Sequence, residues 1–385
     1  MKILWCGPFF SDKAINEKNA PNQAASKWSR GLLRALEGEE CEIMAIDHCP
    51  EQMWPKGRVF WQDDDEKWFL DWYPCEKVAY CNAVGIKKVW LDVAYARRAR
   101  KIMREWHPDV VLCYNSLHSQ NVIVMCEARR AGVKAVPIIL DGDDPRRDHW
   151  SKLLSDNRFA DGVVFLSWWM YENYPDKSIP LLHMDGGAEL PPLSRNQTQE
   201  IRSPKPPFIL VHTGSLDHWR GLGFMQEVVK KCHRDDVRFV FCGKCDKTKM
   251  AAEFANDPRV DVRGFLSKDE LDDVCREADV FLNVRTPGLG DNLVNYPSKI
   301  PNYLAWCKPV VTTWNDSFSP DYREILDVCD DTPEGFVQTL DEVLSRGADE
   351  LKLKSQQIRE WFAVRKTWPC HALRLKNWLQ SEVLR

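Results

Sequence analysis

The feature that most constrains the fold is an alternation of short apolar runs with amphipathic helical stretches, which occurs in two series along the 385 residues. The apolar runs are predicted strands, at 2–6, 109–113, 135–140 and 161–166 in the first series and at 208–212, 237–242, 260–263, 280–284 and 309–313 in the second. Strands that are apolar throughout and separated by helices are typical of parallel sheets covered on both faces. We therefore predict an α/β chain with two doubly wound, Rossmann-like parallel sheets.

Residues 191–207 separate the two series, because they contain five prolines and almost no apolar periodicity. This composition is typical of a linker. We predict a first domain at 1–195, a linker at 196–207, a second domain at 208–365 and a C-terminal helical segment at 366–385. Two domains of this kind favour a ligand in the cleft between them, at the carboxyl ends of the strands.

Charge and composition exclude some classes of function. Lys and Arg number 53 against 57 Asp and Glu, which disfavours a nucleic acid as the main partner, because duplex binders carry a strongly basic surface. The apolar start of the chain is too short for a signal peptide, and no apolar run reaches the ~18–20 residues of a membrane span. We therefore expect a cytoplasmic protein whose 14 cysteines are reduced.

A glycine turn follows the first strand of the second series. Residues 213–216 read TGSL, and Arg220-Gly221 precede a predicted helix at 222–232. A strand, a glycine turn and a helix start present backbone N–H groups to an anion, and the guanidinium of Arg220 matches phosphate oxygens. The turn is a candidate phosphate site, although such turns occur throughout α/β proteins.

A second candidate anion site begins the predicted helix at 298–306. Pro297 suits the first turn of a helix, which then holds the hydroxyl of Ser298 and the ammonium of Lys299. A cation in the first turn opposes the helix dipole. An anion between the two would account for the placement, and an ordinary solvated helix end is the alternative.

Four blocks of the second series resemble, in order, the retaining glycosyltransferases of GT-B fold in glycosyltransferase family 4, the "glycosyl transferases group 1". The blocks are TGSL with RG (213–216 and 220–221), VDVRGF with LSKDEL (260–271), ADVFLN (278–283), and YPSK with YLA and KPVV (296–311). The first domain resembles the family only in pattern, with a glycine after the first strand and ADGVVFLS at 160–167. The resemblance implies two Rossmann-like domains facing across a cleft, with the last helix packed back on the first domain.

This resemblance implies the transfer of a sugar, with retention, from a UDP- or GDP-sugar to an acceptor hydroxyl in surface-glycan or glycoconjugate synthesis. The donor would lie on the second domain and a carbohydrate or lipid-linked acceptor on the first, with no cofactor and no metal. The residues that it implies for donor binding are Gly7, Pro8, Gly214, Ser215, Arg220, Arg263, Gly264, Phe265, Ser298, Lys299 and Asn302.

Within that set, Arg220 falls on the family's contact with the donor diphosphate, and Ser298 and Lys299 fall on its contacts with the distal phosphate. The backbone at 263–265 would face the base, and Gly7 with Pro8 would approach the diphosphate from the other domain. Independently of the resemblance, breaking a glycosyl–phosphate bond builds negative charge on the diphosphate. Arg220 and Lys299 would stabilise that charge and are therefore candidate catalytic residues.

Three positions depart from the family's pattern. Asn302 stands where the family often has an acidic residue that holds the ribose, and it binds a hydroxyl more weakly than a carboxylate does. The matching acid eight positions earlier is replaced by Val294, the nearest acid being Asp291, and Ser215 stands where many members carry a second arginine. Two alternatives therefore stay open, a nucleotide-sugar-binding protein without catalysis and a GT-B nucleotide-sugar epimerase.

Asp141 and Asp143 follow the predicted strand at 135–140, where many members place a histidine near the transferred sugar. They are candidate catalytic carboxylates that would orient sugar hydroxyls or polarise the acceptor hydroxyl. One alternative is an acidic turn leading into Pro145. Another is the metal-binding D-x-D of GT-A enzymes, which the blocks of the second domain disfavour.

Three further features have a simpler structural interpretation that is favoured. His118, after the strand at 109–113, is interpreted as a structural histidine rather than a ligand-binding one. Cys242 and Cys245 form a single C-x-x-C without the paired spacing of a zinc site. The basic, aromatic stretch at 87–106 is interpreted as a core helix, with peripheral contact to an anionic membrane at the inner face as the alternative. The sequence leaves the oligomeric state open.

Overall fold

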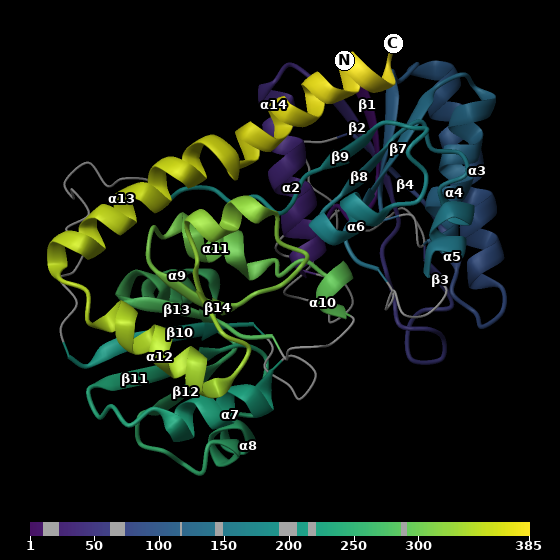
Figure 1. The fold of residues 1–385 in the computed structure, drawn as a ribbon. Helices are drawn as coiled ribbons and strands as arrows, with labels where there is room; N and C mark the ends of the chain where they lie inside the picture. Colours follow the sequence, from purple (N-terminus) through teal and green to yellow (C-terminus); the bar gives the residue numbers. More distant parts are fainter. Residues whose placement is uncertain are drawn as a thin grey trace. The chain divides into compact units, whose positions relative to one another are not determined.

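The computed structural model describes residues 1–10, 23–61, 74–115, 118–142, 149–191, 206–214, 221–285 and 291–385 (Figure 1). The chain forms two compact units, which we describe separately. The first unit comprises Met1–Gly187, Val294–Tyr296 and Trp368–Arg385, and the second comprises Ala188–Leu293 and Pro297–Thr367. The division at Gly187 precedes the predicted linker at 196–207, most of which lies outside the described residues.

The first unit contains a seven-stranded parallel sheet with the order β4-β2-β1-β6-β7-β8-β9. Because β2 and β6 lie on opposite sides of β1, the strand order reverses there, which is where doubly wound folds bind ligands. The strands are β1 (Lys2–Cys6), β2 (Glu42–Asp47), β4 (Cys75–Lys77), β6 (Val110–Tyr114), β7 (Lys134–Ile139), β8 (Val163–Phe165) and β9 (Leu181–His183).

Helices cover this sheet, and α3 and α4 pack against each other beside it (Figure 1). The helices are α2 (Gln23–Gly38), α3 (Lys87–Glu105), α4 (Ser119–Arg130), α5 (His149–Asp156), α6 (Trp168–Asn173) and α14 (Trp368–Trp378), which continues as η4 (Leu379–Val383). Two short antiparallel strands, β3 (Phe60–Trp61) and β5 (Tyr80–Cys81), form a separate ribbon.

The second unit contains a six-stranded parallel sheet with the order β12-β11-β10-β13-β14-β15, which reverses between β10 and β13. Its strands are β10 (Phe208–Thr213), β11 (Val237–Cys242), β12 (Val260–Gly264), β13 (Val280–Asn283), β14 (Val310–Thr313) and β15 (Asp327–Cys329). Its helices are α7 (Leu222–Lys231), α8 (Lys247–Glu253), α9 (Lys268–Glu277), α10 (Asp291–Val294), α11 (Lys299–Ala305), η3 (Pro320–Glu324), α12 (Pro333–Leu344) and α13 (Ala348–Arg365). The predicted α/β class with two doubly wound parallel sheets is therefore confirmed.

The C-terminal helix α14 belongs to the first unit and packs against α2. Trp368 at its start meets the ring of Trp28 edge-on, with ring centroids 5.7 Å apart. A Cβ atom on Gly31 would lie 2.3 Å from the Trp368 ring, so a side chain at this position of α2 would push the two helices apart. Lys376, on the same helix, donates a hydrogen bond to the carbonyl oxygen of Glu39 at 2.6 Å.

Candidate functional site

The carboxyl edge of the second sheet brings three strand ends close together. The N–H of Gly214, after β10, donates to the carbonyl of Cys242 at 2.7 Å, and the N–H of Gly243, after β11, donates to the carbonyl of Gly264 at 2.8 Å. Gly214 has a φ of +94°, in the left-handed region that favours glycine. A Cβ atom on Gly243 would lie 2.2 Å from the carbonyl oxygen of Gly214, so only glycine fits between these two turns.

Lys299, the first residue of α11, extends over this edge. Its Nζ lies 3.2 Å from Nε2 of His212, near the end of β10. A Cβ atom on Gly214 would lie 3.5 Å from the same Nζ, so the ammonium group lies directly beside the Gly214 backbone. The structure thus brings together Gly214 and Lys299, two predicted site residues that are far apart in the sequence.

His212 is the residue of this edge that the sequence analysis missed. Its Nδ1 lies 3.1 Å from the carbonyl oxygen of Leu282, which can only accept, so Nδ1 carries the proton and Nε2 is left to accept from Lys299. The ring is buried. Burial first, and then the charge of Lys299, lowers the pKa of His212 well below its usual range, which keeps the imidazole neutral.

Tyr303 ties α11 to the end of β10. Its hydroxyl accepts hydrogen bonds from the backbone N–H of Thr213 at 2.8 Å and from the Thr213 hydroxyl at 3.1 Å. Its ring stacks on Phe281 of β13 at a centroid distance of 4.5 Å. These contacts fix the start of α11, and with it Lys299, relative to the Gly214 turn.

Replacing Tyr303 by phenylalanine is expected to destabilise the protein by about 1–2 kcal/mol, because the partly buried N–H of Thr213 loses its acceptor. The measurement is the urea concentration at the midpoint of unfolding of the whole chain. The matched control is Tyr171→Phe, since the Tyr171 hydroxyl makes no hydrogen bond within the described ranges. Equal effects of the two substitutions would contradict the role of the Tyr303 hydroxyl.

Ser298 is the N-cap residue of α11, and Asn302 lies one turn further along the helix. Ser298 is exposed, and its side chain makes no capping hydrogen bond to the helix. The amide of Asn302 donates to the carbonyl of Ser298 at 3.0 Å, so part of its hydrogen-bonding capacity is used within its own helix. The two side chains therefore lie one turn apart, on either side of Lys299 in the sequence.

The end of β12 carries the residues predicted to face a base. Arg263 donates from Nε to Asp261 at 3.1 Å, and Asp261 also pairs with Arg238 at 3.1 Å. Phe265, one residue after the strand, is 62% exposed. This strand end presents an aromatic ring to solvent, while the Arg263 guanidinium is engaged with a neighbouring carboxylate.

In the first unit, Gly7 follows β1, where the strand order reverses. A Cβ atom there would lie 2.3 Å from the Cβ of Tyr114, so the turn of Gly7 and Pro8 passes tightly against the end of β6. Asp141 follows β7 and is exposed. The pKa of Tyr114 is raised by burial and, to a smaller extent, by the charge of Asp141.

Three predicted site residues, Ser215, Arg220 and Asp143, lie outside the described residues. Their proposed roles therefore rest on the sequence alone.

The turn after β1 is also held by a buried carboxyl group, that of Asp47 at the end of β2. Asp47 accepts from the backbone N–H of Phe9 at 3.0 Å and of His48 at 2.8 Å. Burial raises the pKa of Asp47 to about 8, against the lowering effect of these hydrogen bonds. The carboxyl group is therefore protonated at neutral pH.

This shift predicts a fall in stability with rising pH. The unfolded chain loses the Asp47 proton near pH 4, whereas the folded chain keeps it until about pH 8, so stability falls across that interval. His48, whose pKa burial lowers to about 3, acts in the opposite direction below its unfolded pKa of about 6.5. The Asp47 effect is hence clearest above that pH.

The measurement compares urea unfolding of the wild type and Asp47→Asn between pH 6.5 and 8. The variant is expected to lose the decline that the wild type shows. Parallel pH profiles for the two proteins would contradict a protonated Asp47.

His118 and the C-x-x-C pair, Cys242 with Cys245, are the remaining features singled out from the sequence. His118 is exposed at the start of α4 and caps no backbone N–H of that helix. Burial raises the pKa of the Cys242 thiol to about 11 and also raises that of Cys245, which disfavours the thiolate form that metals and redox partners need. Within the described ranges, no cluster of three or more His, Cys, Asp or Glu side chains could hold a metal ion.

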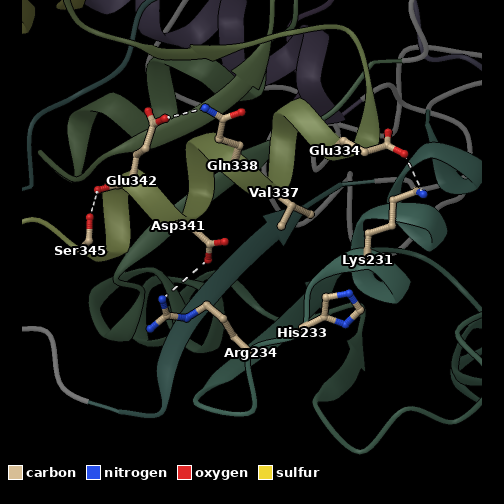
Figure 2. A pocket seen from close by; sticks show the side chains of 9 residues that line it. All are labelled: Lys231, His233, Arg234, Glu334, Val337, Gln338, Asp341, Glu342 and Ser345. Carbon is tan, nitrogen blue, oxygen red and sulfur yellow. Dashed lines mark hydrogen bonds and ion pairs between the residues drawn. The ribbon is translucent and has the colours of Figure 1, made fainter.

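A hollow of about 760 Å³ lies between the end of α7 and α12, away from these residues (Figure 2). Its charges are largely paired, as Figure 2 shows, with Lys231 2.7 Å from Glu334 and Arg234 3.6 Å from Asp341. It contains none of the predicted site residues, so we do not assign a substrate to it. It is lined by Lys231, His233, Arg234, Glu334, Val337, Gln338, Asp341, Glu342 and Ser345.

No protein-family model and no curated protein sequence matches the chain. Solved structures do match over almost the full length. A glycosyltransferase from Rickettsia africae gives a TM-score of 0.69 at 12% identity, covering 98% of each chain. Sucrose-phosphate synthase from Thermosynechococcus elongatus gives 0.66 at 10% identity, covering 99% of this chain and 98% of that one. Anabaena HepE in complex with UDP gives 0.66 at 12% identity, covering 99% and 100%.

Among the described helices, none is both long and apolar enough to cross a membrane. At identities of 10–12%, the likeness to the solved structures establishes the fold alone. The chain therefore has the fold of these proteins, the GT-B fold of two Rossmann-like domains.

Proposed function

We propose that the protein is a glycosyltransferase that moves a sugar, with retention, from a UDP- or GDP-sugar to a hydroxyl of a carbohydrate or lipid-linked acceptor. The GT-B fold and the four sequence blocks that resemble glycosyltransferase family 4 support this proposal. The observation that carries it is the position of Lys299, whose ammonium lies beside the Gly214 turn at the carboxyl edge of the second sheet.

That position suits a donor diphosphate. The neutral imidazole of His212 holds the Lys299 ammonium without neutralising its charge. A charge held beside a glycine turn stabilises the negative charge that develops on the leaving diphosphate. Arg220, six residues after Gly214 in the sequence, would add a planar guanidinium that matches phosphate oxygens. With two cations supplied by the chain, the proposed transfer needs no metal and no other cofactor.

The remaining predicted residues take supporting roles in this proposal. Ser298 would contact the distal phosphate, and Asn302 would bind the ribose through its amide. The exposed ring of Phe265 would lie against the base. Gly7 and Pro8 would approach the diphosphate from the first domain, where Asp141 and Asp143 would orient the acceptor.

The test combines binding and turnover. Isothermal titration with a panel of UDP- and GDP-sugars identifies the donor, and mass spectrometry with candidate acceptors identifies the product. We expect transfer that persists in EDTA and is abolished by Arg220→Ala. Unchanged donor hydrolysis and transfer in Arg220→Ala would show that the donor site is wrongly assigned.

Two other outcomes of this test would replace the proposed transfer by a different function. Tight binding of a nucleotide-sugar without any product would indicate a binding protein that has lost catalysis, as the absence of an acid at Asn302 would allow. A changed sugar nucleotide formed without acceptor would indicate an epimerase.

A further inference from the structure

A group of exposed apolar side chains on the first unit has no part in the proposed reaction. Its members come from residues 53–60 and 84–93, and their exposed fractions lie between 37% for Phe60 and 70% for Val84. We call them the apolar patch: Met53, Trp54, Val59, Phe60, Val84, Ile86, Val89, Trp90 and Val93. Most of the exposed large apolar side chains in the described part of the chain belong to this patch. Concentrated exposure of this kind marks an interaction surface.

The two segments of the patch are joined by specific contacts. The buried side chain of Asn82 donates to the carbonyls of Gln52 at 2.6 Å and of Arg58 at 2.9 Å. The ring of Phe60 meets that of Trp90 edge-on, with centroids 5.7 Å apart. The patch is therefore a built surface in which the loop before β3 lies beside the start of α3.

Helix α3 exposes one apolar stripe and buries another. Ile86, Trp90 and Val93 follow one another at a spacing of three or four residues, which places them on one face, and Arg97 continues that face. Within the stretch at 87–106, Leu91, Tyr95 and Ile102 are buried in the core, whereas Trp90 is 44% exposed. The core-helix interpretation therefore holds for the buried side chains, and Trp90 belongs to the exposed stripe.

Among the described residues, the unpaired charges around the patch are basic. Lys56, Lys88 and Arg97 are exposed, and none of them forms an ion pair with an acidic residue in the described part of the chain. The nearby carboxylate of Glu51 is occupied by Arg58 at 3.2 Å. A second copy of the chain on this surface would bring the same cations together, so the charge favours an anionic partner.

We propose that the apolar patch, with Lys56, Lys88 and Arg97, docks the protein on the surface of a bilayer that contains anionic lipid. Apolar and tryptophan side chains enter the boundary between headgroups and acyl chains, while Lys and Arg bind the phosphates. The two contributions act together, since either one alone gives only weak attachment. This docking goes beyond the proposed transfer and does not depend on it.

The test is co-sedimentation of the full chain with vesicles of phosphatidylcholine, alone or mixed with phosphatidylglycerol. We expect binding to the mixed vesicles. Trp54→Ser with Trp90→Ser should weaken it about tenfold or more, because two large apolar side chains no longer enter the interface. Lys56→Gln, Lys88→Gln and Arg97→Gln together should weaken it about tenfold or more on the mixed vesicles only.

The matched control is Leu353→Ser with Val364→Ser, which removes two exposed apolar side chains from α13 in the second unit. This control should bind as the wild type does. Circular dichroism and the binding of a nucleotide-sugar show that each variant is folded, and they report on the proposed function separately.

Three results would overturn the docking: no binding to mixed vesicles, equal binding by the tryptophan variant and the wild type, or equal binding to neutral and mixed vesicles. A fourth is self-association in sedimentation velocity that the tryptophan variant abolishes, which would assign the patch to a second copy of the chain.

Discussion

Replacing Lys299 by methionine is expected to lower kcat/KM for the proposed sugar transfer by about 10²–10³-fold, the loss typical of removing one preorganised charge from a site of charge development. Methionine keeps most of the length and apolar character of the lysine side chain. The substitution should therefore change the packing little, and its main effect is the loss of the ammonium charge beside the Gly214 turn.

The experiment measures kcat and KM for the donor separately. If Lys299 acts mainly on the developing charge of the diphosphate, kcat falls more than KM rises. The matched control is Lys352→Met, which removes an exposed lysine from α13. A wild-type kcat/KM in Lys299→Met, or an equal loss in the control, would contradict the proposal that Lys299 is a catalytic residue.

The sequence was sufficient to predict most of the two sheets. Every predicted strand is present, with its ends within two residues of the predicted ones, because fully apolar runs between helices leave few other interpretations. Strands β2, β4, β9 and β15 were missed, and three of them have only three residues. Strands β2 and β15 are also bounded by Asp or Glu, at Glu42, Asp47 and Asp327, and these residues interrupt the apolar signal on which the prediction depended.

The site was less accessible to sequence reasoning. The resemblance placed Gly214 and Lys299 in one site. In the structure, β10 lies beside β13, and α11 comes after β13 in the chain, which brings the two residues together. The resemblance gave no reason to select His212 as a site residue. The available signal was the one polar residue at the end of the predicted apolar strand FILVH (208–212), whose buried neighbours demand a hydrogen-bond partner for it. The contacts of a buried ring with Leu282 and Lys299 depend on strand order, which a local pattern does not contain.

His212 leads to the second prediction, because its Nε2 lies 3.2 Å from the Lys299 ammonium and accepts from it. Replacing His212 by phenylalanine should keep the volume of the ring but leave the ammonium without this acceptor. We expect kcat/KM to fall about 30-fold, or about 2 kcal/mol, the cost of displacing a charged hydrogen bond. The larger part of the loss should be in KM for the donor, since the ammonium remains present but is less well positioned.

His212→Gln separates positioning from packing. The glutamine amide oxygen can still accept from Lys299, so this variant should recover most of the activity that phenylalanine loses, although it fills the site less well. The pH profile gives a second distinction. In the wild type, protonation of His212 far below neutral pH places two cations together, which adds an acid limb to kcat/KM. Glutamine does not titrate, so this limb should be absent from His212→Gln. If His212 only filled space in the core, phenylalanine would be the better replacement of the two and the acid limb would be the same in all three proteins.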